Sequence, residues 1–392
     1  SELYRRTHRE EDARLARASI AALRAAPQHF PGQEALFAYL NGILAINDDR
    51  AAGQRALRDA IARTGTNTTE YDFKVRAYSY SILALDAAKA SEFGNMLSIL
   101  ADTLGVPRPE RCALALAVQD EQIAVAFADA AGQTGGTYTA TRASLELDVA
   151  GLVPSTTVER LRGCERVAVL TRAPVLGSGG LLPRDLAWSY TLPRSTPARP
   201  AATGKRVVVA NPLPPTDLKL PPLGPLPEES SATTTVLRGA DATPSRVLQT
   251  IRDASVVEFH THGFIANDVS EASYLVLSPE VDGHYAMTAR DVVQAKLDAA
   301  PLVILGACHA ATSSRSLEGG IGLAEAFLRA GARAVVASPD AVPDLGAQAF
   351  FAAVRDRVTH GADPAVAVRD ERARLLAASP DHAWIAGIVV FE

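Results

Sequence analysis

An apolar run that stops at a cysteine is the feature that most restricts the fold of this chain. Residues 302–307 read Leu-Val-Ile-Leu-Gly-Ala, and the next residue is the small, reactive Cys308. A short apolar run of this kind predicts a buried strand. From residue 207 onward, such runs alternate with segments of helical spacing. This alternation predicts an α/β fold in which helices flank a mostly parallel sheet.

A second apolar run ends in the same way. Residues 256–263 read VVEFHTHG, so His262 and Gly263 follow a predicted strand as Cys308 does. In open parallel sheets, catalytic groups gather outside the carboxyl ends of the strands. We therefore expect His262 and Cys308 to meet at one edge of the sheet.

Further elements are predicted from the same periodicities and from Gly and Pro punctuation. In the first half, strands are expected at residues 114–118, 123–127, 143–149 and 167–170, with turns at Gly132 and at the pair Gly135 and Gly136. In the second half, strands are expected at residues 207–210, 256–262, 274–277, 302–307, 333–337 and 384–391. Helices are expected at residues 246–252, 289–296, 322–330, 345–358 and 364–377.

The N-terminal region has a different texture. Residues 10–104 are rich in Ala, Leu and Arg, and their apolar side chains recur at helical spacing. Prolines and polar clusters divide this stretch into helical hairpins that resemble tetratricopeptide repeats; a helical bundle without a binding role is the alternative. We expect a helical domain at residues 1–105, a strand-rich half at 106–200 and a catalytic half at 201–392.

Composition argues against several classes of partner. The chain has 39 basic and 44 acidic residues, a net charge of -5, and no long run of either sign. We therefore expect no direct binding to nucleic acid or to an anionic membrane. No apolar stretch approaches the roughly 20 residues that span a bilayer, and the charged N-terminus is unlike a signal peptide.

The cysteine count points to a compartment. Three cysteines, Cys112, Cys164 and Cys308, are too few in 392 residues for a disulfide framework, and their spacing matches no zinc motif. We expect a reducing, cytoplasmic location, and we expect no metal or other cofactor.

The two strand ends carry the chemistry of a cysteine nucleophile. A thiol is a weak nucleophile until a neighbour takes its proton, and His262 is the candidate base for Cys308. The N–H groups of Gly263 and Cys308 are candidate donors to a developing oxyanion. From composition alone, a buried core cysteine is the simpler interpretation of Cys308, and the pairing with His262 argues against it. His260 and His262 also face the same side of an extended strand, so a zinc site with Cys308 or His309 is an alternative.

Residues from about 112 to the end resemble the CHAT domain, the caspase-like cysteine peptidase module of bacteria. The matching segments occur in the family's order, at residues 123–142, 188–190, 208–212, 258–263, 274–278, 302–308, 324–332, 335–338 and 342–344. The resemblance implies a caspase-like sheet preceded by tetratricopeptide-type helices. It also implies that His262 and Cys308 are the catalytic dyad.

The resemblance further implies a role. Such a domain suggests a regulated cysteine endopeptidase that makes limited cuts in one or a few protein partners, in a bacterial antiviral, CRISPR-linked or cell-death signalling system. An upstream activating protease or regulatory protein is the further partner that it implies. These expectations come from the family and not from the residues themselves.

Two departures from the family pattern concern the site. Gly306 stands where the family commonly has serine, a change small enough to keep the turn. Pro339 and Asp340 replace the usual Leu-Trp, and an acid there suggests a pocket that selects Arg or Lys before the scissile bond. Asp344 is the second candidate for that role. A helix or turn cap is the alternative for both acids.

The segment after the nucleophile is a candidate gate. Residues 309–320 are rich in Ala, Thr and Ser, as mobile loops beside active sites often are. We expect activation by ordering of this loop, through a partner or through cleavage after Arg315. The rival functions are a catalytically inert scaffold of the same architecture, which an intact dyad argues against, and a metal-dependent hydrolase built on His260 and His262.

Overall fold

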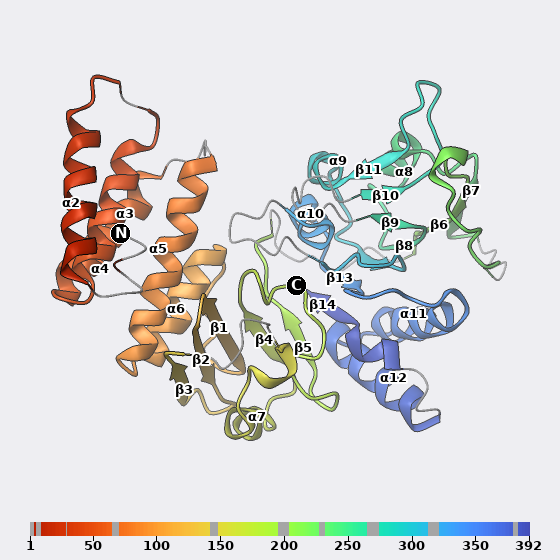
Figure 1. Cartoon of the computed structure of the whole chain (residues 1–392). Helices are drawn as coiled ribbons and strands as arrows, with labels where there is room; N and C mark the ends of the chain where they lie inside the picture. Colours follow the sequence, from red (N-terminus) through yellow and green to blue (C-terminus); the bar gives the residue numbers. More distant parts are fainter. Residues whose placement is uncertain are drawn as a thin grey trace.

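The fold is described from a computed structural model of the 392-residue chain (Figure 1). It describes residues 4, 9–28, 30–64, 70–141, 148–194, 204–226, 232–264, 274–312, 321–378 and 383–392. Helices come first in the chain, and a large sheet with helices on its faces follows. Among the described residues, no helix has the length and apolarity needed to cross a bilayer.

Helices form the N-terminal region, as the periodicity predicts, and five of them lie within the described residues. They are α2 (Glu10–Ala25), α3 (Gln33–Ala45), α4 (Arg50–Arg63), α5 (Glu70–Lys89) and α6 (Phe93–Leu104). Two glycines let α3 and α4 pack closely. A Cβ on Gly42 would lie 2.7 Å from Cγ of Leu57, and one on Gly53 would lie 2.4 Å from Cα of Ile46. These two glycines therefore set the close approach of the hairpin.

After these helices, the described residues form an eleven-stranded sheet in the order β3-β2-β1-β4-β5-β14-β13-β12-β8-β6-β7. All neighbours from β1 to β7 in this order are parallel except β14 and β13, so the predicted mostly parallel sheet is confirmed. Its strands are β1 (Ala113–Gln119), β2 (Gln122–Ala128), β3 (Thr134–Thr139), β4 (Val167–Leu170), β5 (Trp188–Tyr190), β6 (Arg206–Pro212), β7 (Thr234–Gly239), β8 (Val256–His260), β12 (Leu302–Leu305), β13 (Ala334–Ala337) and β14 (Val389–Phe391). A second, three-stranded sheet joins β9 (Gly263–Phe264), β10 (Tyr274–Val276) and β11 (Ala286–Thr288).

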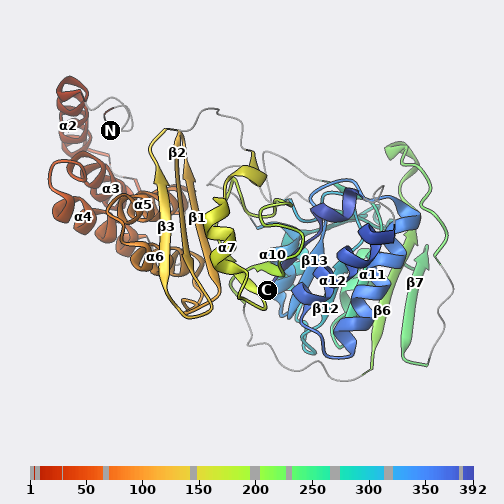
Figure 2. The ribbon, with the colours of Figure 1, turned by 90° about the horizontal axis from the view of Figure 1, so that it is seen from below.

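Helices cover both faces of the parallel region, which explains its continuous apolar strands. On one face, α11 (Asp344–Thr359) and α12 (Pro364–Ala378) bury Phe350, Phe351 and Val354 against side chains of β12, β13 and β14. On the other face lie α9 (Ala289–Gln294) and α10 (Leu323–Ala330). Helices α5 and α6 pack on β1, β2 and β3 at the far end of the sheet (Figure 2). The shorter helices are α7 (Ser155–Leu161) and α8 (Pro244–Thr250).

The end of α10 shows how local sequence sets an element boundary. The helix stops at Gly331, as predicted, and this glycine takes a left-handed φ of 116°. Its N–H donates to the carbonyl oxygen of Leu328, and the next N–H, of Ala332, donates to that of Phe327. Glycine is the residue that reaches this conformation without strain.

The chain's last strand connects the two halves of the sheet. Strand β14 pairs with β5 and with β13. The N–H of Glu392 donates to the carbonyl oxygen of Tyr190, and the N–H of Leu192 donates to that of Glu392, both at 2.8 Å. The rings of Tyr190 and Phe391 stack with centroids 5.4 Å apart. One continuous sheet therefore carries strands from both halves.

Three local predictions differ from the structure. Gly135 and Gly136 lie inside β3 and not in a turn, because a Cβ at Gly136 would lie 2.1 Å from the carbonyl oxygen of Val125 in the neighbouring strand. Residues 383–387 form a 3₁₀ turn, so the last strand is shorter than predicted. Of the strand expected at 143–149, residues 143–147 lie outside the described residues, and residues 149–151 form a 3₁₀ turn.

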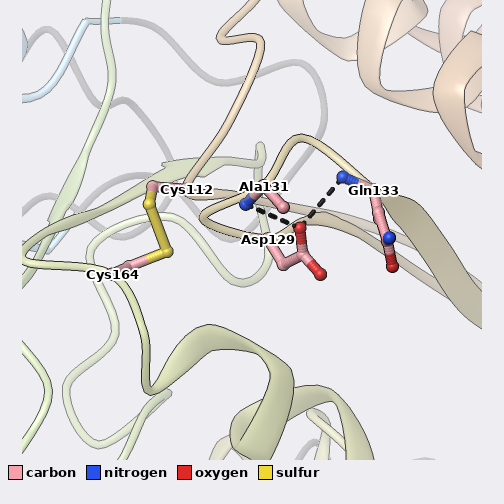
Figure 3. The surroundings of a disulfide bond; sticks show 5 residues. All are labelled: Cys112, Asp129, Ala131, Gln133 and Cys164. Carbon is pink, nitrogen blue, oxygen red and sulfur yellow. Dashed lines mark hydrogen bonds between the residues drawn. A yellow bond between two sulfur atoms is a disulfide. The ribbon is translucent and has the colours of Figure 1, made fainter.

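The cysteine count did not predict a disulfide, but the structure contains one. Cys112 and Cys164 form a disulfide with their Cα atoms 5.5 Å apart (Figure 3). The bond joins the residue before β1 to the segment between α7 and β4. Beside it, the Asp129 carboxylate accepts hydrogen bonds from the N–H groups of Ala131 and Gln133, at 3.0 and 2.9 Å. Sequence spacing cannot show this pairing, because the two cysteines meet only after β1 and β4 pair.

The disulfide is expected to stabilise the strand-rich half. It closes a loop of 52 residues, and in the chain-entropy model such a cross-link contributes up to about 4 kcal/mol. Cys164→Ser should therefore lower the free energy of unfolding by up to that amount, measured by urea titration. Reduction of the wild type should have the same effect, whereas Cys308→Ser should leave the urea midpoint unchanged. Equal midpoints for Cys164→Ser and the oxidised wild type would contradict a bond formed in solution.

Candidate active site

The parallel pairing of β8 and β12 brings the two predicted strand ends together. Phe259 lies opposite Leu305 in the register, so the residues that follow each strand leave the sheet at the same edge. Contact is direct at Gly263, where an added Cβ would lie 2.7 Å from the carbonyl oxygen of Cys308 and 3.4 Å from Cβ of Ala307. Only glycine fits at this position.

The imidazole of His262 is held by a backbone carbonyl from a distant segment. Its Nε2 lies 2.9 Å from the carbonyl oxygen of Pro221. Because a carbonyl oxygen can only accept, Nε2 carries the hydrogen and Nδ1 of the neutral ring keeps its lone pair. The contact therefore selects the tautomer in which Nδ1 is the base. Sequence analysis missed Pro221, since a carbonyl leaves no signal in the side-chain pattern of a Pro-rich loop.

The N–H of Gly263 is directed away from the small sheet. The N–H of Val276 donates to the carbonyl oxygen of His262 at 2.9 Å. Hydrogen-bonded and non-hydrogen-bonded pairs alternate along an antiparallel ladder. Gly263, the next residue, faces Leu275 and so points its N–H away from β10. This leaves it available as a donor beside Cys308.

Cys308 is half-buried and unpaired, and a fixed turn follows it. His309 takes a left-handed φ of 59°, and its N–H donates to the carbonyl oxygen of Asp340 at 3.2 Å. Its Nδ1 lies 2.8 Å from the carbonyl oxygen of Pro339, and the N–H of Ala311 donates to that of Ser338 at 2.9 Å. The turn after the cysteine is thus anchored to the end of β13.

The glycine at position 306 has a steric cause. A Cβ there would lie 2.8 Å from the carbonyl oxygen of Phe259 and 3.3 Å from Nδ1 of His260. A serine would force β8 and β12 apart at the site, so this departure from the family pattern is matched by the close approach of His260.

Asp340 lines a cavity of about 430 Å³ on the β13 side of Cys308. Thr312 and the glycine-rich residues 176–180 form other parts of the wall. The carboxylate lies against Gly387, whose added Cβ would be 2.6 Å from Oδ2 of Asp340. Among the residues that the structure describes, no basic side chain forms an ion pair with Asp340. A negative charge thus stands in a cavity large enough for a side chain.

A buried tyrosine supports the opposite wall of this cavity. The hydroxyl of Tyr190 donates toward the carbonyl oxygens of Ser178 at 2.7 Å and Val175 at 3.0 Å. Burial raises the pKa of Tyr190, so the hydroxyl stays protonated as a donor. The glycine-rich loop was missed from the sequence, although its Leu-Gly-Ser-Gly-Gly composition was a usable signal.

The structure does not bring the other predicted site residues together with Cys308 and Asp340. Asp344 begins α11, whose N-cap residue is Pro343, and the side chain of Asp344 lies outside the described residues. Arg315 also lies outside them. Within the described ranges, no three His, Cys, Asp or Glu side chains come together as metal ligands would. His260 instead turns to Glu258, with Nε2 3.7 Å from the carboxylate.

Glu258 is the centre of a buried charge cluster behind the site. Its side chain is 2% exposed, and it accepts hydrogen bonds from Arg206 at 2.6 Å and Arg355 at 3.2 Å. Burial would raise the pKa of Glu258, but His260, Arg206 and Arg355 outweigh it and hold the value at about 2. The cluster joins β6, β8 and α11, and no sequence pattern indicated it.

The fold and the placement of Cys308 beside the His262–Gly263 segment define a cysteine-peptidase-like α/β domain. Residues 101–390 match the CHAT domain family, and the chain belongs to that family. The resemblance named from the sequence is thereby confirmed. A search of curated proteins finds no match. Similar solved structures include the complex of Porphyromonas gingivalis RgpB pro- and mature domains. It is 12% identical, the alignment covers 62% of this chain and 70% of that one, and the TM-score is 0.40.

Glu258 is expected to contribute to stability above acidic pH. Its pKa of about 2 lies below the ordinary 4.5, so the stabilisation is present above pH 4.5 and is lost as the pH falls toward 2. The amount is about 3 kcal/mol. Glu258→Gln should be less stable than the wild type at pH 7, and the difference should shrink at pH 3. Urea unfolding at both values measures this. Glu159→Gln, in an exposed pair with Arg162, is the control with no expected difference. If the free energies of unfolding of Glu258→Gln and the wild type differ by the same amount at both pH values, the lowered pKa of Glu258 is contradicted.

Proposed function

We propose that this protein is a cysteine endopeptidase in which Cys308 is the nucleophile and His262 the base. The observation that carries the proposal is the contact of Gly263 with Cys308 beside a histidine whose Nε2 is bound to the Pro221 carbonyl. A nucleophile, a base with an oriented tautomer and a third group that orients the base are the parts that such catalysis needs.

The proposed reaction has two stages. Nδ1 of His262 takes the proton of the Cys308 thiol, and the thiolate attacks the carbonyl carbon of the peptide bond. The N–H groups of Gly263 and Cys308 hold the oxyanion. Collapse breaks the C–N bond, and the leaving nitrogen receives the proton from His262. A water deprotonated by His262 then hydrolyses the thioester and restores the thiol.

Asp340 is the proposed determinant of the residue before the scissile bond. Its carboxylate faces a cavity of about 430 Å³ and has no cationic partner among the described residues. An Arg or Lys side chain of the substrate would supply the missing charge. Asp344 is the weaker candidate, because it begins α11.

The biological role is proposed from the family alone. Limited cleavage of one or a few protein partners in a bacterial antiviral, CRISPR-linked or cell-death signalling system stays a proposal, as does activation by a partner or by cleavage after Arg315. The cytoplasmic location stays a proposal, and the Cys112–Cys164 disulfide is an observation that favours an oxidising compartment instead. Alkylation of Cys112 and Cys164 in intact cells would support a reducing location.

Activity on a peptide library tests the dyad. Cys308→Ala should reduce cleavage to background, and His262→Ala should lower kcat by about 100- to 10,000-fold, since the general base is lost. His284→Ala, in an exposed turn, is the matched control and should cleave as the wild type does.

Three results would argue otherwise. Chelator-sensitive activity that survives Cys308→Ala would favour the metal-dependent hydrolase. A wild type that cleaves no peptide and no co-purified partner would favour the inert scaffold. Full activity of uncut Arg315→Ala protein without a partner would contradict activation at Arg315.

The Asp340 cavity predicts a preference for basic residues. Peptides with Arg before the scissile bond should be cleaved faster than those with Leu or Asp. Asp340→Asn should lower kcat/KM for the Arg peptide by about 100-fold, because a charge-paired contact is lost. The Leu peptide should be little affected. Asp102→Asn, on the exposed side of α6, is the control. Preference of the wild type for Asp would exclude this role.

A further inference from the structure

An aromatic surface begins two residues after the proposed base. Phe264 is 37% exposed, and its ring stacks on that of Tyr274 with centroids 5.5 Å apart and planes 16° apart. Tyr285 meets Tyr274 edge-on at 6.3 Å. We call Phe264, Tyr274 and Tyr285 the aromatic surface. It lies on the small sheet β9–β10–β11, next to the end of β8 (Figure 1).

The two faces of this small sheet differ. Leu275 and Met287, which pair across β10 and β11, are fully buried in the main core. Phe264, opposite Tyr274 in the register, lies on the other face. Core packing therefore explains Leu275 and Met287, whereas Phe264 stays partly exposed and stacks on Tyr274 outside the core. An exposed large aromatic side chain beside a catalytic edge is a feature of binding sites.

The order of the strands sets the direction of a bound peptide. Cys308 follows β12, which lies between β13 and β8. The Asp340 cavity is on the β13 side, and His262 is on the β8 side. The acyl part of the substrate stays on Cys308 with its side chain in the Asp340 cavity. The leaving nitrogen must be near His262 to receive its proton, so the residues after the scissile bond pass over the β8 side.

Continuity of the backbone then brings the leaving segment to the aromatic surface. His262, Gly263 and Phe264 are consecutive, and two residues of extended chain span roughly 7 Å. The leaving nitrogen belongs to the first residue after the scissile bond. The side chain of that residue therefore lies within one residue length of the nitrogen. Phe264, two residues after the proposed base, is thus an exposed apolar side chain on the β8 side that this residue can reach.

Resting on the proposed peptidase function, we propose that Phe264 and Tyr274 bind the residue that follows the scissile bond and select a large apolar or aromatic side chain there. Stacked rings present apolar area in a fixed orientation, because each ring holds the other in place. The edge-on contact of the Tyr285 ring with Tyr274 adds to this fixing.

The test uses the full chain and quenched peptides that share an Arg before the bond and differ only in the next residue: Phe, Leu, Ser or Glu. The wild type should cleave the Phe and Leu peptides about 10-fold faster in kcat/KM than the Ser peptide. Phe264→Ala should remove this preference and leave the Ser peptide unchanged. Val281→Ala, fully exposed in the turn between β10 and β11, is the matched control.

A charge-reversing variant provides a readout that a structural role would not produce. Phe264→Arg should prefer Glu over Phe after the bond, an inversion of the wild-type order. Labelling of Cys308 by a peptidyl fluoromethyl ketone, which has no residue after the bond, should be equal in all variants and shows that each is folded. Two results overturn this inference alone. In the first, the wild type cleaves all the peptides equally well, whatever residue follows the bond. In the second, Phe264→Arg is labelled at Cys308 but keeps the wild-type preference. Absence of both cleavage and labelling overturns the proposed function and this inference with it.

Discussion

The in-register parallel pairing of β8 and β12 is the constraint on which the site depends. Both strands are buried on both faces, so a shift by one residue would exchange the two sets of side chains. Glu258 makes such a shift costly, because its carboxylate would leave Arg206 and Arg355 and enter an apolar core. The buried charge cluster thus fixes the register, and the register fixes the distance between the two strand ends.

The site also requires glycine at positions where the backbone packs closely against neighbouring atoms. At Gly263, Gly306 and Gly387 an added Cβ would lie within 2.8 Å of a neighbouring oxygen atom. The first two lie at the ends of β8 and β12, and the third is beside Asp340. Gly263 lies against the carbonyl oxygen of Cys308 and Gly306 against that of Phe259, so these two backbone contacts are at distances that only glycine permits. The site is compact because its walls are backbone, and its chemistry comes from few side chains.

The parts of the fold and the site that follow from local sequence patterns could be predicted from the sequence. The strand-helix alternation after residue 207 predicted the parallel sheet, and the end of α10 at Gly331 followed from a residue that stops helices. The two strand ends were placed at one edge because parallel topology leaves few alternatives. The Glu258 cluster, the Pro221 carbonyl and the Cys112–Cys164 bond escaped prediction, since each joins residues that only the folded chain brings together. Gly135 and Gly136 misled for a related reason: glycine signals a turn in isolation, but here it accommodates a neighbouring strand.

The disulfide has a practical consequence for the cysteine at the end of β12. All three cysteines lie in the part of the chain that the structure describes, and once Cys112 and Cys164 are joined, Cys308 alone is unpaired. A fluorophore or spin label attached through sulfur under non-reducing conditions would therefore occupy a single position. Its signal would come from the strand edge where the peptide is proposed to bind, without substitution of any other residue. The oxidised chain thus carries a native, site-specific reporter position.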